Sequence, residues 1–99
     1  MVKTVRWNNR ALDTFYEIAN YLEINHSSKT AEKFVNSVFD KIAVLKKYPL
    51  IGRKAPKRKT IRFVRVDKHR RLYYRLNGRQ LIISSIFDTR QHPDKDFHQ

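Results

Sequence analysis

The stretch that decides the fold is Arg70–Phe87, which reads RRLYYRLNGRQLIISSIF. Two runs rich in β-branched and aromatic residues flank Asn77-Gly78, a pair preferred in two-residue type I′ hairpin turns. We therefore predict antiparallel strands at 70–76 and 79–87, with Asn77 and Gly78 as the turn between them.

If the turn consists of these two residues, the pairing of the strands follows from the pleat. The face predicted to pack on the rest of the chain pairs Leu76 with Arg79, Tyr74 with Leu81 and Leu72 with Ile83. The other face pairs Arg75 with Gln80, Tyr73 with Ile82 and Arg71 with Ser84. A basic, partly aromatic surface is thus expected on the side of the sheet that points away from the core.

Two earlier segments have the apolar period of amphipathic helices. The first is expected at about 9–23, after the capping residues Asn8 and Asn9, with the stripe Ala11, Leu12, Phe15, Ile18, Ala19 and Leu22. The second is expected at about 28–47, capped by Ser28, with the stripe Ala31, Phe34, Val35, Val38, Phe39, Ile42 and Leu45. Pro49 forbids its continuation, and the short polar link at 25–28 predicts an antiparallel helical hairpin.

The other segments complete an α+β fold. Residues 2–7 alternate apolar and polar side chains, as an edge strand does; 49–59 reads as a loop and 60–66 as a further strand. The expected architecture is an N-terminal strand, an antiparallel two-helix hairpin, then a three-stranded antiparallel meander that forms a twisted sheet packed on the helices. Residues 1–99 form one domain, with an irregular tail from about residue 89.

Positive charge is concentrated in one part of the chain. The formal net charge is +13, and residues 53–75 hold eleven of the 22 Lys and Arg residues with Asp67 as their sole acid. Such a stretch favours an anionic partner: a nucleic acid, an acidic protein or an anionic membrane surface, of which we prefer the first two. The sequence has no cysteine, no signal-peptide core and no apolar run of membrane-spanning length; we expect a cytoplasmic protein without a membrane partner.

The order of the parts resembles the RelE/ParE superfamily of toxins from bacterial type II toxin–antitoxin systems, over about residues 5–93. The resemblance rests on Trp7 closing the first strand, the helical hairpin and the pattern L-x-x-x-P-x-x-G-R from Leu45 to Arg53. A strand with Arg62 and the segment RLYYRLNGRQLIISSIFDTRQHP then follow. The resemblance implies an acidic antitoxin that masks the basic surface within a toxin–antitoxin hetero-oligomer.

The superfamily has two activities, and the sequence leaves both open. RelE-like toxins enter the ribosome and cut mRNA without a metal, whereas ParE-like toxins have no nuclease activity and poison DNA gyrase. We favour mRNA cleavage because a domain this basic suits a site built of RNA. A gyrase inhibitor is the alternative, and an inactive, toxin-like RNA-binding module is a third hypothesis.

Candidate site residues follow from the chemistry of RNA cleavage, in which arginines stabilise the charged phosphorane and an imidazole transfers protons. The catalytic candidates are Arg62, Arg65, Arg75, Arg90 and His92. The nucleic-acid-binding candidates are Arg53, Lys54, Lys57, Arg58, Lys59, Arg71 and Tyr73, with Tyr73 stacking on a base. No metal-ligand spacing and no Gly-rich phosphate loop occur, so we expect no metal or cofactor. Two features count against nuclease activity. The C-terminal tail has no tyrosine, which several RelE-like nucleases carry there, and residues 53–66 contain no acid that could act as a base.

Overall fold

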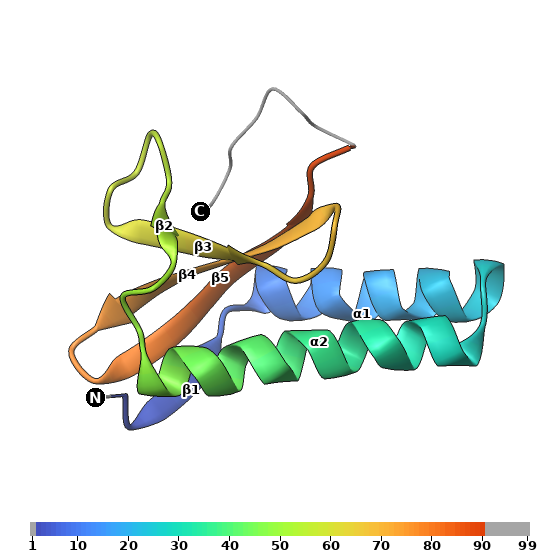
Figure 1. Cartoon of the computed structure of the whole chain (residues 1–99), viewed down its shortest axis with the longest axis horizontal. Coiled ribbons are helices and arrows are strands. Elements are labelled where there is room, and N and C mark those ends of the chain that lie inside the picture. The colour runs from blue at the N-terminus through green and yellow to red at the C-terminus, as the bar shows by residue number, and fades with distance from the viewer. Residues whose placement is uncertain (1, 91–99) are drawn as a thin grey trace.

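Strands β4 (Arg70–Asn77) and β5 (Gln80–Asp88) lie at the centre of a five-stranded sheet in the computed structural model, which describes residues 2–90 (Figure 1). The strand order is β1-β5-β4-β3-β2. β1 (Thr4–Trp7) runs parallel to β5 at one edge, and β3 (Ile61–Arg65) runs antiparallel to β4. The α+β fold and the N-terminal edge strand are thus confirmed.

One strand lies where the sequence predicted only a loop. β2 (Arg53–Lys54) pairs antiparallel with β3 at the other edge of the sheet. A strand of two residues shows no period that a sequence pattern can reveal, so the prediction of an uninterrupted loop at 49–59 was wrong at this point.

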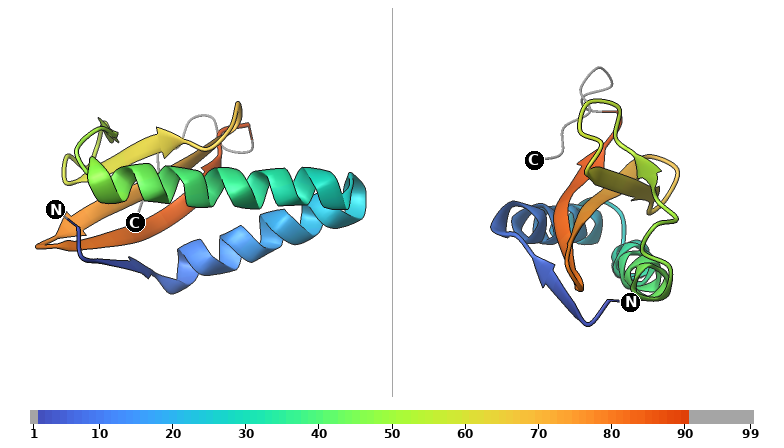
Figure 2. Two further views of the ribbon diagram at one scale, coloured as in Figure 1. Left: turned by 60° about the horizontal axis from the view of Figure 1, so that its bottom comes forward. Right: turned by 90° about the vertical axis from the view of Figure 1, so that its left-hand side faces the viewer.

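Both helices begin at a capping side chain. Helix α1 (Asn9–Asn25) starts after Asn8, whose side chain accepts a hydrogen bond from the Ala11 backbone N–H at 3.0 Å. Helix α2 (Ser28–Lys47) is capped by Ser27, which accepts from the Thr30 N–H at 3.0 Å, and not by Ser28 as predicted. The two helices lie side by side and run antiparallel (Figure 2).

The apolar faces of both helices pack on one face of the sheet. The core contains Ala11, Phe15 and Leu22 of α1, Ala31, Phe34, Val38, Ile42 and Leu45 of α2, and Leu72, Tyr74, Leu81, Ile83 and Ile86 of the sheet. Most of the predicted stripes are therefore confirmed. Leu12 and Phe39 are exceptions, because they stay 36% and 51% exposed at the borders of their stripes.

The predicted turn of the central hairpin was wrong by one residue, and the partner of each β4 residue near the turn is therefore shifted by two. Asn77 pairs with Gln80 and Leu76 with Leu81, so the two turn residues are Gly78 and Arg79. Gly78 has a φ of +61°, and no non-glycine residue in the described chain has a positive φ. A glycine at the first central position is the signature of a type II′ turn, whereas the predicted type I′ turn would also have forced Asn77 into that region.

A β-bulge then changes the pairing again further along the hairpin. Tyr74 pairs with Ile83 but Tyr73 pairs with Ser85, which leaves Ser84 as the extra residue of β5. Leu72 consequently faces Ile86 and Arg71 faces Phe87, in place of the predicted Ile83 and Ser84. The assignment of β4 side chains to faces survives both shifts, because Leu72 and Tyr74 pack with the helices while Tyr73 belongs to a separate cluster.

Candidate nucleic-acid interface

We call the sheet face that points away from the helices the outer face. Over β3 and β4 it is formed by three cross-strand pairs: Arg65 with Arg71, Phe63 with Tyr73 and Ile61 with Arg75. Two like charges directly opposite each other destabilise a sheet. A bound anion would reduce the repulsion between these two guanidinium groups.

The aromatic pair of the outer face supports Arg71. The guanidinium carbon of Arg71 lies 4.4 Å from the centre of the Phe63 ring, and its Nη1 donates to the Tyr73 hydroxyl at 3.3 Å. The Phe63 and Tyr73 rings are themselves 5.3 Å apart. Arg71 is half-buried on this platform, whereas Arg65 opposite it is exposed and makes no hydrogen bond or ion pair with any described residue.

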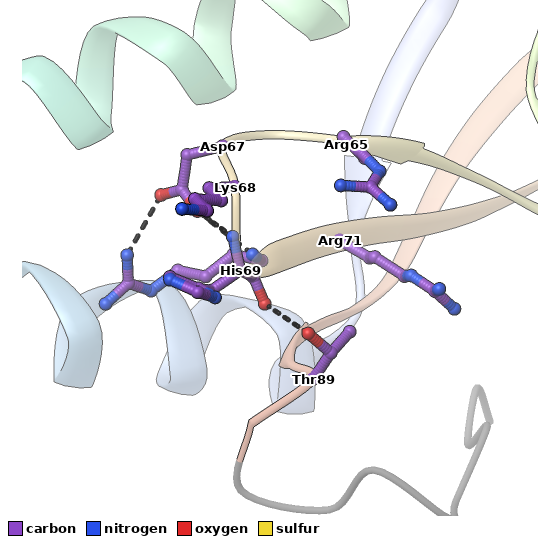
Figure 3. Close-up of a pocket in the computed structure, with 7 residues that line it drawn as sticks. Arg65, Asp67, Lys68, His69, Arg71 and Thr89 are labelled. Carbon is purple, nitrogen blue, oxygen red and sulfur yellow. Dashed lines mark hydrogen bonds and ion pairs between the residues drawn. The ribbon is translucent and has the colours of Figure 1, made fainter.

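A pocket lies beside the turn between β3 and β4 (Figure 3). It is lined by Arg65, Asp67, Lys68, His69, Arg70, Arg71 and Thr89. The turn is held in shape by Asp67, whose Oδ1 accepts from the backbone N–H groups of His69 and Arg70 at 2.9 and 3.0 Å. Thr89, at the end of β5, donates its N–H and its hydroxyl to the His69 carbonyl at 2.8 and 3.0 Å. The pocket therefore has a fixed backbone and a cationic lining.

An alternating chain of charges borders this pocket. Arg70 donates to Asp67 at 2.9 Å and lies 4.0 Å from Asp88, and its guanidinium also covers the Phe34 ring of α2 at 5.5 Å. Asp88 accepts from the Arg90 side chain at 2.9 and 3.2 Å. The hydrogen bond from the Arg90 side chain is the main cause that lowers the pKa of Asp88, against a smaller opposing effect of burial.

Of the five catalytic candidates, the structure brings two to the outer face. Arg65 and Arg75 are exposed there. Arg62 is not, because it shares the helix-facing side of β3 with Val64, and its Nη1 donates to the Leu50 and Gly52 carbonyls at 3.1 and 2.8 Å. Arg90 is bound to Asp88, and His92 lies outside the described residues.

The nucleic-acid-binding candidates fall into two groups. Arg53, Lys54, Lys57, Arg58 and Lys59 are all exposed on β2 and the loop that follows it. Arg71 lies on the outer face as predicted. Tyr73 lies there too, but its side chain is fully buried beside Ala55, Ile61 and Phe63. The predicted stacking of a base on Tyr73 does not fit this structure, since the ring is closed to a ligand.

Sequence reasoning missed most of the pocket. Lys68, His69, Arg70 and Thr89 were not among the candidates, although His69 and Lys68 stand beside the two paired arginines of the outer face. Asp67 was the available signal, because an aspartate that opens a tight turn organises the residues after it. Among residues 2–90, no group of three or more His, Cys, Asp or Glu side chains is placed to hold a metal ion. No helix in this part of the chain is long and apolar enough to cross a membrane.

Comparison with known protein families identifies the family of this chain. The sequence pattern of the family described as the ParE toxin of the type II toxin–antitoxin system parDE matches residues 5–93. The chain belongs to this toxin family. It is therefore a toxin of a type II toxin–antitoxin system, as the resemblance implied. No curated protein has a significant match to the chain in sequence.

Solved structures of such toxins share the fold. A chain of the chromosomal ParDE system from P. aeruginosa superposes with a TM-score of 0.73 at 16% identity, covering 88% of this chain and 96% of that one. A YoeB/ParE toxin from Agrobacterium tumefaciens gives 0.63 at 15% identity, covering 87% and 98%. The YoeB dimer from Staphylococcus aureus gives 0.62 at 12% identity, covering 86% and 94%. At these identities the likeness is one of fold, and the fold includes both ParE and YoeB toxins.

Proposed function

We propose that this toxin stops growth by cutting mRNA in the ribosome, with Arg65 and Arg71 binding the phosphate at the cleavage point. The observation that carries the proposal is the placement of two guanidinium groups directly opposite each other on the outer face. Arginine binds phosphate oxygens through a rigid, permanently charged fork. Two such forks from neighbouring strands supply the charge that a phosphorane dianion requires.

The proposed reaction is an internal transfer within the RNA. The 2′-oxygen attacks the adjacent phosphorus and loses its proton, and the bond from phosphorus to the 5′-oxygen breaks. The 5′-oxygen leaves with a proton, so the products are a 2′,3′-cyclic phosphate and a 5′-hydroxyl. An imidazole suits both proton transfers. His69 lines the pocket beside Arg65 and Arg71, and His92 remains a candidate from the sequence.

The remaining cations would hold the RNA without reading it. Arg75 lies two residues along β4 from Tyr73 on the same face, and the five exposed cations at 53–59 flank the sheet at β2. Contacts of lysine and arginine with phosphates give affinity that falls with salt. We assign these residues to backbone binding and Arg65 and Arg71 to the reacting phosphate.

An acidic antitoxin is the proposed partner that keeps the toxin inactive in the cytoplasm. The family is defined by toxin–antitoxin systems, and a solved relative of the fold is the YoeB–YefM complex from Staphylococcus aureus. A chain with a net charge of +13 is complementary to an acidic protein. The proposed assembly is a toxin–antitoxin hetero-oligomer.

Inhibition of DNA gyrase by binding is the second candidate. One observation in its favour is the match to the ParE family. Another is that two arginines predicted to bind phosphate are already hydrogen-bonded within the protein. Arg62 and Arg90 are both hydrogen-bonded within the protein, Arg62 to backbone carbonyls and Arg90 to Asp88. A toxin that only binds its target needs no arginine poised for catalysis.

Induction of the chain in a sensitive bacterium, followed by mapping of mRNA 5′ ends, separates these functions. We expect new ends inside reading frames within minutes for the wild type, and their loss in Arg65→Gln and Arg71→Gln. Arg10→Gln is the matched control, because Arg10 is an exposed cation on α1, away from the outer face. Growth arrest with intact mRNA and a DNA-damage response would replace the proposal with gyrase inhibition. RNA binding without growth arrest would indicate an inactive toxin-like module.

A further inference from the structure

The end of α2 and the turn after it present large apolar side chains to solvent. Tyr48, Leu50 and Ile51, which we call the apolar turn, are 60%, 64% and 56% exposed. Val44, one helical turn before Tyr48, is a further 42% exposed. Single exposed apolar residues are common on protein surfaces, but a contiguous group marks a site of interaction.

The backbone of the apolar turn is held rigidly. The buried Tyr74 hydroxyl donates to the Pro49 carbonyl at 2.6 Å and accepts from the Gly52 N–H at 3.0 Å. Arg62 adds its two hydrogen bonds to the Leu50 and Gly52 carbonyls. A turn fixed by side chains from two strands keeps Leu50 and Ile51 in solvent without allowing them to collapse onto the core. Such preorganisation lowers the entropy cost of binding.

Cationic residues stand on both sides of the apolar turn. Lys46 and Lys47 precede it, and Arg53 and Lys54 follow it; all four are exposed. This pattern of apolar anchors with a cationic border complements a surface of apolar side chains bordered by carboxylates. A second copy of this chain is a poor fit, because it would bring two bodies of charge +13 together.

From these observations we propose that the apolar turn docks an acidic amphipathic segment of a partner protein, with Leu50 and Ile51 as the anchors. The apolar turn lies at the end of α2, whereas Arg65 and Arg71 lie on the outer face of the sheet. The docking proposal rests on the acidic antitoxin proposed above as the partner, but not on mRNA cleavage. A partner bound here leaves room for a second contact with the outer face, which would raise its affinity by avidity.

The test uses the full chain and a labelled synthetic peptide of about twenty residues, with Leu along one helical face and Glu and Ala on the other. Fluorescence anisotropy at about 150 mM salt measures its Kd. We expect the double change Leu50→Ser and Ile51→Ser to raise the Kd about tenfold or more, because two apolar anchors are lost. A control peptide in which every Leu is replaced by Ser should bind the wild-type chain no more tightly than the original peptide binds the double variant.

Ile24→Ser is the matched control, since Ile24 is 80% exposed at the far end of the helical hairpin. It should leave the Kd unchanged within about twofold. Tyr74→Phe, which removes the hydroxyl that fixes the turn, should weaken binding by a smaller factor than the double change. Growth inhibition is scored separately and reports on the proposed function alone, so the two proposals can fail independently.

Three results would overturn the docking proposal. The first is a wild-type chain that does not bind the peptide, or binds it equally well after the double change. The second is binding to vesicles with about one third anionic lipid that depends on Leu50 and Ile51, which would assign the apolar turn to a membrane surface. The third is self-association of the wild type, measured by sedimentation, that the double change abolishes.

Discussion

Arg62 and Arg65 stand on the same strand three residues apart, yet their surroundings differ completely. Arg62 points to the helix side of the sheet and donates two hydrogen bonds to the carbonyls of the turn at 49–52. Arg65 points to the outer face, is exposed, and lies directly opposite Arg71. The first guanidinium satisfies backbone groups of its own protein, whereas the second is left for an external anion.

The two regions around these arginines differ in the same way. The turn at 49–52 is held by Tyr74, Arg62 and Gly52, and its hydrogen bonds are internal. The outer face holds Arg65 and Arg71 directly opposite each other, and like charges in this arrangement reduce stability. We therefore expect changes to the groups that hold the turn through these hydrogen bonds to act on folding first, and changes at the outer face to act on function first.

Gly52→Ala should give the largest loss of stability, because the new Cβ would lie 2.5 Å from the Tyr74 hydroxyl and 3.0 Å from the Phe63 carbonyl oxygen. Neither neighbour can move freely, since Tyr74 is buried and Phe63 belongs to β3. We expect the free energy of unfolding to fall by about 2 to 3 kcal/mol. Urea denaturation measures this change.

Gly78→Ala is the control for this prediction. A Cβ at Gly78 meets nothing within 4 Å, but its φ of +61° is strained for alanine. Its cost of about 1 to 2 kcal/mol should add to that of Tyr74→Phe, because the sites share no contact. Gly52→Ala and Tyr74→Phe should be non-additive. Additive behaviour at both glycines would show that the turn is not packed against Tyr74.

The comparison of Arg62→Gln with Arg65→Gln tests the two uses of arginine directly. Loss of the two hydrogen bonds to backbone carbonyls should cost Arg62→Gln about 1 to 2 kcal/mol of stability. Arg65→Gln should change stability by no more than about 0.5 kcal/mol, or raise it slightly by relieving the repulsion from Arg71. Toxicity should fall in Arg65→Gln at unchanged stability; equal stability losses in the two variants would contradict the contrast.

The sequence predicted the layers of this fold well because the apolar periods of the helices are long. The stripes around Phe15 and Phe34 span several turns, so errors at single positions did not matter. Short features were harder to predict. Ser27 and Ser28 are chemically equal as caps, and Asn77-Gly78-Arg79 fits more than one two-residue turn. The bulge at Ser84 depends on tertiary packing, and no local pattern indicates it.

The site could be predicted only to the level of its charge. Arg62 and Arg65 both follow an apolar residue on a strand with apolar residues on both faces, so alternation does not say which arginine is outward. The hydrogen bond from Tyr74 to Pro49 joins residues 25 apart in the sequence. This contact helps to hold the turn whose Leu50 and Gly52 carbonyls Arg62 binds, and only the three-dimensional structure reveals these contacts.

Alkaline pH should weaken the turn through Tyr74, whose pKa is raised by burial, with smaller opposing effects of the Gly52 N–H and the Arg62 charge. A raised pKa in the folded state means that this stability is complete below the ordinary tyrosine pKa of about 10 and is lost as the pH rises through the folded value. The stability difference between wild type and Tyr74→Phe should therefore shrink above about pH 10. Denaturation between about pH 8 and pH 11 measures it, and a constant difference would contradict the role of the neutral phenol.

Asp88→Asn should have the smallest effect on stability. It tests whether Arg90 resembles Arg62, which binds groups of its own protein, or Arg65, which is left for an external anion. The lowered pKa of Asp88 gives stability that is present above the ordinary aspartate pKa of about 4 and is lost as the pH falls through the lower folded value. Because the Arg90 side chain is 56% exposed, solvent screens the pair and we expect its contribution to stability to be small. Asp88→Asn should lack this acid-dependent loss.

The decisive measurement on Asp88→Asn is its affinity for single-stranded RNA between about 50 and 200 mM salt. If Arg90 can bind an RNA phosphate once it is released from Asp88, the Asp88→Asn variant should bind RNA more tightly. The slope of log affinity against log salt concentration should then be steeper by about one unit. Arg90 would then join Arg65 among the arginines that serve a partner. Unchanged RNA affinity together with the lost acid dependence would place it with Arg62, as a charge that the protein uses to hold its own structure.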